Sequence, residues 1–421
     1  MSTTYTRRAV LGVIGGLGLS GIAGRAVAAP GDQTTFTTTG QALTLRLLTA
    51  GAWDGRRSYL DEFVGGRWVN RATQTAAAWG LAGRATGQWR VTVHRSPSGY
   101  DDLRVTLPLP TPATPGTGGL ATAYSGAWVG SGGNARAGTF GTWRGRPVSL
   151  GLDYLDHGSR SSLFASLDSP GYWIDYPGRK LVLGVPIIDD AKAMTFAAGA
   201  AGTYDAHFTN LATALVRGGH ADAVLRVAWE ANGSFSPYFT TDTAAFRTYW
   251  RRVVAAMRAV AGQHFQFDLC MSNTSGPWGD RYPGDDVVDI LSTDVYDFDY
   301  SDPGHTKTGA QRFSAIRGGG AGLDYLTRLA ARTTGSAAVP TGASRPIAVG
   351  EWSGCALGDF GGMGGGDDPA WVQAFHDWLA AQPRVVYESY FNDIGGSDDI
   401  LNGRLPRQAA RYRQLFGAGV A

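Results

Sequence analysis

Glutamate, lysine and cysteine are scarce in this chain of 421 residues. The sequence has 31 Asp but only four Glu, and 34 Arg but only three Lys. The two cysteines, Cys270 and Cys355, are too few for a disulfide framework and leave open one disulfide or none. Because glutamate is not the default acidic residue of this chain, each glutamate calls for its own explanation. Two of them, Glu230 and Glu351, stand at the ends of apolar, strand-like runs.

Several sequence motifs that are typical of metal, redox or esterase sites are also absent. The chain contains no CxxC pair, no HExxH helix motif and no GxSxG elbow, which argues against common metal and redox sites and against a serine esterase. The formal net charge is only +2 and the charges are scattered, so nothing indicates a nucleic acid or an acidic membrane as a partner. We expect neither a cofactor nor a bound metal.

Long apolar runs are absent outside the N-terminus. There, the pair Arg7-Arg8 precedes an apolar stretch from Val10 to Ile22 that is too short to span a bilayer, and the small-residue run 26–29 resembles a cleavage signal. Residues 1–29 therefore predict a twin-arginine signal peptide and secretion. The alternative, an N-terminal membrane anchor, is less favoured because no stop-transfer segment follows.

Residues 30–107 lack helical periodicity. Short alternating runs separated by Gly, Asn and Ser predict a small β-sandwich of Ig-like type. Its tryptophans could line a sugar platform, but packing is the favoured interpretation; they are Trp53, Trp68, Trp79 and Trp89. Residues 108–119 are rich in Pro, Thr and Gly and predict a stiff linker between two domains.

From residue 120 to 417 apolar runs alternate with amphipathic segments. The expected strands are 121–129, 148–155, 181–188, 223–230, 265–271, 287–296, 346–351 and 384–391. Among the expected helices, one begins after the capping residue Asp242 and another after Asp368-Pro369. Eight strands with intervening helices predict a (β/α)8 barrel, with a doubly wound open sheet as the alternative.

In such a barrel, functional groups lie at the carboxyl ends of the strands. The fourth expected strand ends in Trp229-Glu230 and the seventh in Glu351-Trp352, so each places one carboxyl group at the mouth beside a tryptophan. Glycoside hydrolysis needs one protonated and one ionised carboxyl group. The sequence thus predicts Glu230 and Glu351 as the catalytic pair of a glycoside hydrolase. The alternative is that either one is a buried ion-pair partner of Arg226.

The residues around these glutamates resemble glycoside hydrolase family 26 and its relatives in clan A, which include β-mannanases and some β-glucanases and xylanases. The resemblance covers most of residues 120–417 and is carried by the segments 202–207, 225–233, 294–296, 350–352 and 390–392. It implies that Glu230 is the acid/base and Glu351 the nucleophile of a retaining double displacement. It further implies that Tyr296 hydrogen-bonds the nucleophile and that Asn232 shapes the acid/base loop.

Two departures from that family fall near the sugar subsites. The family commonly has His before the acid/base where this chain has Trp229, and its aromatic-Pro-aromatic run is altered to the segment 235–238, which ends in Tyr238. These changes put the mannan assignment in doubt. Sugar rings stack on aromatic side chains, so aromatic residues near the strand ends are the further subsite candidates. The substrate-binding candidates are Trp229, Asn232, Tyr238, Trp128, Trp278, Tyr282, Asp294, Trp352 and Phe391.

Three further segments have weaker signals. The acidic run 297–302 is a poor match to a calcium loop and favours a polar subsite rim. The glycine-rich run 361–366 could form a lid over the cleft. Glu388 is out of phase with its strand neighbours Tyr387 and Ser389 and is expected to face the barrel exterior, paired with an arginine.

Taken together, the sequence predicts a secreted, monomeric, retaining glycoside hydrolase that cleaves a β-linked polysaccharide, with mannan as the first guess. The alternatives are a clan A enzyme acting on β-glucan, xylan or an arabinose-containing wall polymer, or a carbohydrate-binding protein without activity. The presence of both glutamates counts against the last of these.

Overall fold

The structure is a computed structural model of the chain. It describes residues 3–6, 34–39, 42–47, 57–64, 67–75, 78–80, 87–94, 100–107, 120, 122–276, 279–299, 302, 304–331 and 345–417. The expected linker, most of the expected signal peptide and Trp278 lie outside these ranges, so the domain boundaries and the leader stay predictions.

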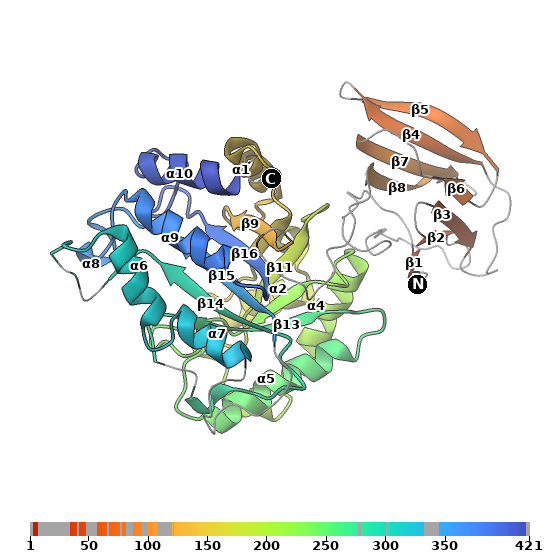
Figure 1. Ribbon diagram of the computed structural model, residues 1–421. Helices are drawn as coiled ribbons and strands as arrows, with labels where there is room; N and C mark the ends of the chain where they lie inside the picture. The colour runs from red at the N-terminus through yellow and green to blue at the C-terminus, as the bar shows by residue number, and fades with distance from the viewer. Residues whose placement is uncertain are drawn as a thin grey trace.

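Two four-stranded antiparallel sheets come first in the chain and form a body of their own (Figure 1). The first sheet has the order β1 (Thr3–Thr6), β2 (Thr34–Thr39), β3 (Ala42–Leu47) and β6 (Ala78–Gly80). The second has the order β5 (Arg67–Gln74), β4 (Ser58–Val64), β7 (Gly87–His94) and β8 (Tyr100–Leu107). The buried Trp79 joins the two sheets, because its Nε1 donates a hydrogen bond to Ser58 Oγ at 2.9 Å. Trp79 is therefore a packing residue and not part of an exposed sugar platform.

Eight parallel strands then close into a barrel. They are β9 (Tyr124–Trp128), β10 (Leu150–Tyr154), β11 (Lys180–Val185), β12 (Val224–Val227), β13 (Gln266–Ser272), β14 (Ile290–Tyr296), β15 (Ile347–Ser353) and β16 (Val385–Phe391). Strands β16 and β9 pair with each other and complete the ring. The predicted (β/α)8 barrel behind a small all-β domain is thus confirmed, and the open doubly wound sheet is wrong.

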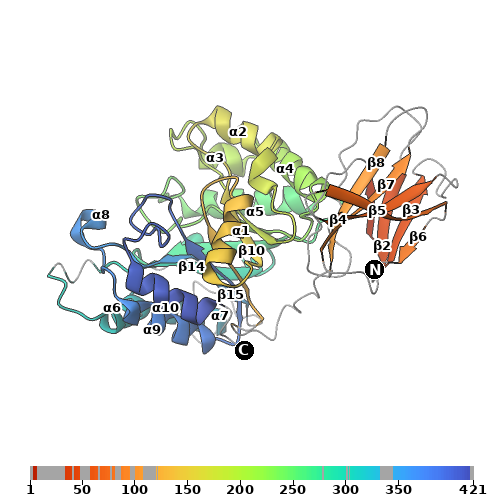
Figure 2. The same cartoon turned by 90° about the horizontal axis from the view of Figure 1, so that it is seen from above.

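Helices surround the barrel, as Figures 1 and 2 show. They are α1 (Asn134–Arg144), α2 (Arg160–Asp168), α3 (Phe196–Ala200), α4 (Asp205–Arg217), α5 (Thr243–Arg258), α6 (Gly309–Gly318), α7 (Leu323–Ala331), α8 (Asp359–Gly362), α9 (Pro369–Ala380) and α10 (Pro406–Phe416), with 3-10 turns η1 (Gly171–Ile174) and η2 (Gly279–Arg281). The expected caps form: Asp242 accepts a hydrogen bond from Ala245 N, and Asp368 accepts one from Ala370 N ahead of Pro369 at the first turn.

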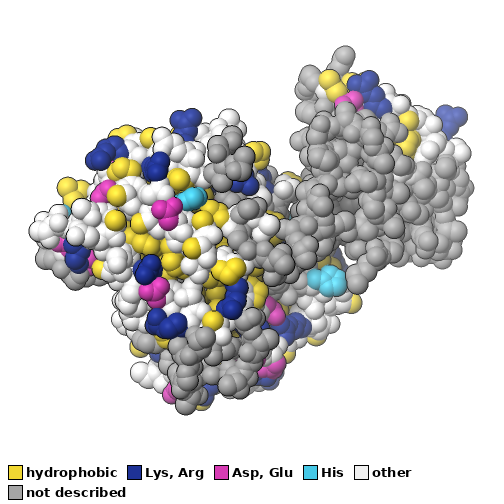
Figure 3. Space-filling model, in the orientation of Figure 1, with side chains coloured by type: hydrophobic (Ala, Val, Ile, Leu, Met, Phe, Trp, Pro, Cys, Tyr) yellow, Lys and Arg dark blue, Asp and Glu magenta, His cyan; other side chains and the backbone are white. Residues whose placement is uncertain are grey.

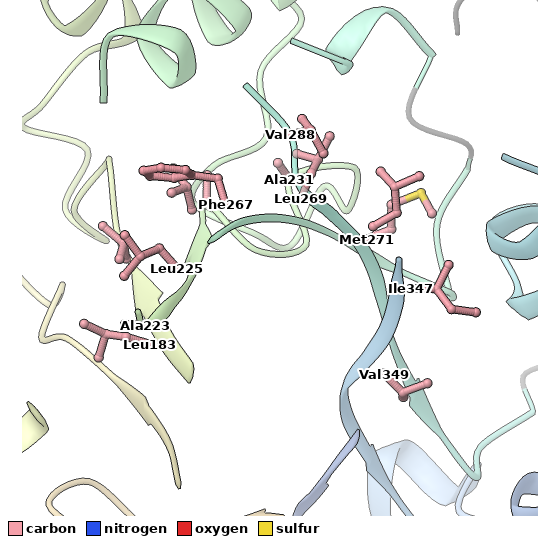
Figure 4. Close-up of a cluster of buried hydrophobic side chains, with 14 of the residues drawn as sticks. Leu183, Ala223, Leu225, Ala231, Phe267, Leu269, Met271, Val288, Ile347 and Val349 are labelled. Atoms are coloured by element: carbon pink, nitrogen blue, oxygen red, sulfur yellow. The ribbon is translucent and has the colours of Figure 1, made fainter. Parts of the chain in front are cut away.

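The main apolar core lies between the strands and the helices. Alternate strand residues such as Leu225, Phe267, Leu269 and Val349 are buried there, on the convex side of the arc of strands in Figure 4. The residues between them point inward. A small apolar layer that includes Leu150, Leu152 and Val224 fills the lower barrel, and polar side chains occupy the layer above it. This alternation decides which side chains can reach the mouth.

The surface agrees with the weak net charge. On the face seen in Figure 3, acidic and basic side chains are interspersed over the residues drawn in colour, with no broad area of one sign. Within the described part of the chain, no helix combines the length and the apolar character that crossing a bilayer requires.

Candidate active site

Glu351 reaches the barrel interior because strand β15 contains an irregularity. Thr293 of β14 pairs with Val349, but the next residue, Asp294, pairs with Glu351, so Gly350 is an extra residue. Gly350 has no side chain to clash with its neighbour: a Cβ there would lie 2.7 Å from Arg226 Cζ. The bulge and the glycine together bring the carboxyl group of Glu351 beside the guanidinium of Arg226.

Three donors hold the carboxyl group of Glu351. Tyr154 Oη donates to Oε1 at 2.5 Å, Arg226 Nη1 donates to the same oxygen at 2.9 Å, and Tyr296 Oη donates to Oε2 at 2.5 Å. The glutamate is 5% exposed. Three hydrogen bonds, one of them from a cation, fix the orientation of this carboxyl group. The family resemblance implies a hydrogen bond from Tyr296 to Glu351, and this hydrogen bond is present.

Arg226 is a second anchor of the site and is itself completely buried. Its Nη2 donates to both oxygens of Asp294 at 2.7 Å and lies 3.0 Å from Cys270 Sγ. Burial is the largest single influence and lowers the pKa of Arg226, but the surrounding groups, Asp294 first among them, together raise this pKa above its ordinary value. For Glu351, an ion pair with Arg226 and a position at the mouth are not alternatives, because this residue has both.

Glu230 follows strand β12 in a strained turn. The strand ends at Val227, earlier than the expected 223–230, and both Ala228 (φ 51°) and Glu230 (φ 56°) adopt the left-handed conformation that non-glycine residues rarely take. The turn is held from both sides, because Glu230 N donates to Cys270 O at 3.2 Å and Gly233 N donates to Glu230 O at 2.9 Å. Strain of this kind persists only where surrounding contacts impose it, and it is common at functional sites.

The carboxyl group of Glu230 favours its protonated form. Burial, followed by the negative charge of Glu351, raises the pKa of Glu230 to about 8, while a hydrogen bond from Ser272 and the charge of Arg226 act weakly in the other direction. At neutral pH Glu230 therefore carries a proton. The mouth of the barrel thus places a proton donor within electrostatic reach of an ionised carboxylate.

Half-buried aromatic rings surround the two carboxyl groups. Phe391, at the end of β16, stacks on Trp128 from β9 with ring centroids 4.4 Å apart and meets Tyr296 edge-on at 6.0 Å. Tyr154 lies 6.1 Å from Trp128, and Trp229 packs against Tyr154 at 5.0 Å. Three of the proposed subsite residues, Trp128, Trp229 and Phe391, thus lie together at the mouth, as a sugar-binding wall would require.

Trp352 is not at the mouth, and its interpretation as a substrate-binding residue is wrong. Successive strand residues face opposite sides, so the side chain next to Glu351 points outward. Trp352 is completely buried among the helices, where it stacks on Phe375 at 4.2 Å, and its Nε1 donates to Glu388 Oε2 at 2.6 Å. Glu388 does face outward as expected, but it accepts a hydrogen bond from this indole rather than from an arginine.

Other candidates also serve the framework. Asp294 is fully buried and both its oxygens are used by Arg226, so it cannot bind substrate. Tyr238 is 1% exposed and packs behind Trp229 at 5.0 Å. Asn232 accepts a hydrogen bond from Ser272 N and donates to the Ser272 and Gly276 carbonyls. Its amide holds the loop that carries Glu230, and both of its N–H groups are used there.

Of the remaining aromatic candidates, Tyr282 is buried and its hydroxyl donates to Asp285 at 2.5 Å, and Trp278 lies outside the described residues. Carboxylates of the acidic run 297–302 are also used in ion pairs. Asp297 pairs with Arg312, and Asp299 pairs with Lys307.

The glycine-rich run after β15 is tied down at two points, because Gly365 N donates to Asp297 O and Gly366 N donates to Cys355 O. Cys270 and Cys355 are both free thiols. In the described part of the chain, no group of three or more His, Cys, Asp or Glu is placed to hold a metal.

Sequence reasoning missed Tyr154 and the positioning role of Arg226. Both carry a signal that could have found them. Tyr154 is in phase with the inward-facing Leu150 and Leu152, and Arg226 is in phase with Val224, so strand alternation alone points both side chains into the barrel. A polar group at an inward position near a strand end is a candidate for the site.

Comparisons with known proteins give solved structures of similar architecture. No family model matches the chain, and no curated protein matches it in sequence. The catalytic domain of the GH26 endo-β-1,4-mannanase from Bacillus sp. JAMB-750 is 15% identical, with a TM-score of 0.45, over 70% of this chain and 87% of that one. The GH26 β-mannanase BoMan26A from Bacteroides ovatus is 16% identical, with a TM-score of 0.42, over 64% and 79%. A β-glucuronidase from Ruminococcus gnavus is 10% identical, with a TM-score of 0.49, over 99% and 68%. At these identities and TM-scores the likeness assigns no activity to the chain.

Proposed function

We propose that this protein is a retaining glycoside hydrolase in which Glu351 is the nucleophile and Glu230 the acid/base. One observation carries the proposal: two carboxyl groups lie within electrostatic reach of each other at the barrel mouth, in different surroundings. Three donors bind the carboxyl group of Glu351, one of them the cation of Arg226, and burial together with the charge of Glu351 raises the pKa of Glu230 to about 8. Glycoside hydrolysis by double displacement requires this combination.

In the first step Glu351 attacks the anomeric carbon while Glu230 gives its proton to the glycosidic oxygen. The bond from carbon to the leaving oxygen breaks, and a glycosyl ester forms on Glu351. Oxygen Oε1 already accepts two donors, Tyr154 and Arg226, whereas Oε2 accepts only Tyr296. We therefore assign the attack to Oε2, which keeps more of its lone-pair capacity.

In the second step the ester removes the negative charge that raises the pKa of Glu230. The pKa of Glu230 then falls, and the carboxylate left by the first step can take a proton from water as the water attacks the anomeric carbon. The sugar leaves with its original anomeric configuration, and Glu230 regains its proton. One electrostatic contact thus switches Glu230 from acid to base.

The aromatic wall of the mouth favours a glycan as the substrate, since sugar rings offer apolar faces to stacked side chains. We propose a β-linked polysaccharide, with mannan as the first substrate to test. The alternative is another clan A substrate such as β-glucan, xylan or an arabinose-containing polymer, and Trp229 in place of the family's histidine is the specific observation that favours it. Export through the twin-arginine signal would deliver the enzyme to such wall polymers.

The test is release of reducing sugar from mannan, β-glucan, xylan and arabinoxylan by the full chain and by its Glu230→Gln and Glu351→Gln variants. We expect activity on at least one polymer and a loss of about a thousandfold or more in each variant. Proton NMR of the first product should show retained configuration. Equal activity in all three proteins would refute the assignment, and binding without cleavage by wild type would favour the carbohydrate-binding alternative.

A further inference from the structure

A second polar layer lies inside the barrel beneath the candidate active site. Asp268 of β13 pairs in register with Arg226 of β12, and on neighbouring parallel strands such residues face the same side. Asp268 is completely buried. Its Oδ2 accepts hydrogen bonds from Tyr387 Oη and from Ser292 Oγ, the latter at 2.9 Å. Two further strands, β16 and β14, thus fix the orientation of this carboxyl group.

Asp268 takes no part in the proposed chemistry, yet it is a buried carboxyl group with an unused oxygen. Among the described residues neither Asp268 Oδ1 nor Arg226 Nε has a hydrogen-bond partner. One atom is an acceptor and the other a donor, and they belong to residues that are register partners. Leaving either group unpaired inside a protein is unfavourable, and a single buried water that accepts from Arg226 Nε and donates to Asp268 Oδ1 would satisfy both.

The charges around Arg226 make this contact consequential. The titratable groups that interact with the charge of its guanidinium include Asp294, Glu351, Tyr154, Cys270, Asp268, Tyr387 and Glu230. Burial raises the pKa of Asp268 to about 6, with the positive Arg226 and the bonds from Tyr387 and Ser292 acting against the rise. At neutral pH Asp268 is therefore ionised, and Arg226 is held between a carboxylate below it and the nucleophile above it.

We propose that Asp268 is a positioning residue for the nucleophile, which it orients by holding Arg226 from the barrel floor. The chain of interactions runs by hydrogen bonds from Tyr387 and Ser292 to Asp268, by charge from Asp268 to Arg226, and by a hydrogen bond from Arg226 to Glu351. The absence of a side chain at Gly350 allows the guanidinium to occupy this position, since a Cβ there would lie 2.8 Å from Arg226 Nε. This proposal rests on the proposed function only for its kinetic consequence. Its structural consequence is independent of any activity.

The test is the near-isosteric variant Asp268→Asn, measured with the polymer that wild type cleaves fastest. We expect kcat to fall about tenfold with KM within twofold of wild type, because the sugar contacts are intact and only the nucleophile is displaced. Tyr387→Phe removes only the hydroxyl group that orients Asp268, and we expect a smaller loss of kcat, about threefold, again without a change in KM. This second variant keeps the proposal testable if Asp268→Asn does not fold.

A matched control separates positioning from general stability. Arg144 is also a buried charged residue, but it binds Ser125 Oγ and the Pro147 carbonyl at the amino ends of β9 and β10, the end of the barrel opposite the mouth. Arg144→Gln should lower the melting temperature and leave kcat per folded molecule unchanged. A kcat within twofold of wild type in Asp268→Asn, or a loss that only follows the folded fraction, would overturn the proposal.

Crystal structures of wild type and Asp268→Asn give a readout that does not depend on substrate. We expect the contact from Arg226 Nη1 to Glu351 Oε1, 2.9 Å in the native chain, to lengthen or break in the variant. An unchanged contact would overturn the positioning role. If wild type cleaves no glycan but this contact breaks, the proposed function fails and the structural role of Asp268 stands.

Discussion

Glu351 and Trp352 are neighbours in the chain but lie on opposite sides of the barrel wall. The carboxyl group of Glu351 points into the barrel, where Arg226 and two tyrosines bind it. The indole of Trp352 points outward into the helical layer and binds the buried Glu388. Substitutions at these two adjacent positions should therefore have different consequences, one for catalysis and one for stability.

Trp352→Phe should lower stability and spare catalysis. The change removes the indole N–H that satisfies Glu388 Oε2 at 2.6 Å and leaves a buried acceptor unpaired, which costs about 1–3 kcal/mol. Chemical denaturation should show this loss, whereas kcat per folded molecule should stay within about twofold of wild type. A large fall in kcat with unchanged stability would mean that Trp352 reaches the substrate after all.

Tyr154→Phe should lower kcat/KM by about tenfold to a hundredfold, because a hydrogen bond to a charged group contributes about 1.5–3 kcal/mol and 1.4 kcal/mol is a factor of ten. The lost bond is the one from the hydroxyl group to Glu351 Oε1. Tyr249→Phe is the matched control, since its buried hydroxyl donates to the Ile187 carbonyl instead. Steady-state kinetics of both variants check the prediction, and equal effects in the two would contradict it.

The raised pKa of Glu230 predicts a link between pH and stability. In the unfolded chain the carboxyl group titrates near its ordinary value of 4.5, whereas in the folded chain its pKa is about 8. Between these values the folded state binds the proton and the unfolded state does not, so the protonated group's contribution to stability is lost as pH rises through this window. Wild type should lose stability relative to Glu230→Gln from about pH 4.5 to pH 8, with a constant difference above that.

Thermal melting of the two proteins across this pH range measures the effect. Parallel curves would show that the pKa of Glu230 is not raised in the folded state. The same shift predicts that activity declines as pH passes through about 8, where the acid loses its proton before it can donate it.

Gly350→Ala should disturb the site through Arg226. The added methyl group would lie 2.7 Å from Arg226 Cζ, so the guanidinium must move. We expect a loss of about tenfold or more in kcat, since small displacements of catalytic groups have large effects. Gly318→Ala at the end of α6 is the control: nothing lies within 4 Å of the added methyl group, and activity should not change. Kinetic assays of both variants decide between these outcomes.

Local patterns were enough to predict the framework. Apolar runs located all eight strands, and the caps at Asp242 and Asp368 fixed two helix starts, because these features depend on residues a few positions apart. The strand-end rule singled out Glu230 and Glu351. The side of the barrel wall on which each side chain lies was not always predicted correctly, as Trp352 shows. The extra residue at Gly350 depends on pairing between β14 and β15, and nothing in the local sequence reveals it.

The hydrogen bonds of the polar layer inside the barrel could not be predicted from the sequence either. Asp294 looked like a substrate contact because it precedes Tyr296 on the expected sixth strand, yet its partner, Arg226, lies 68 positions earlier in the chain. Tyr154 and Glu351 are separated by 197 positions. Hydrogen bonds between residues so far apart in the chain form only when the strands close into a barrel. Patterns among residues a few positions apart do not predict them.

The stack of Trp128 on Phe391 joins the first barrel strand to the last. During synthesis the ribosome delivers Trp128 early and Phe391 nearly last, so one wall of the mouth is missing until almost the whole chain has emerged. Any nascent or truncated fragment that ends before β16 should be inert toward glycans, however well its earlier strands have folded. Catalytic competence in this architecture would arise in a single step, at ring closure.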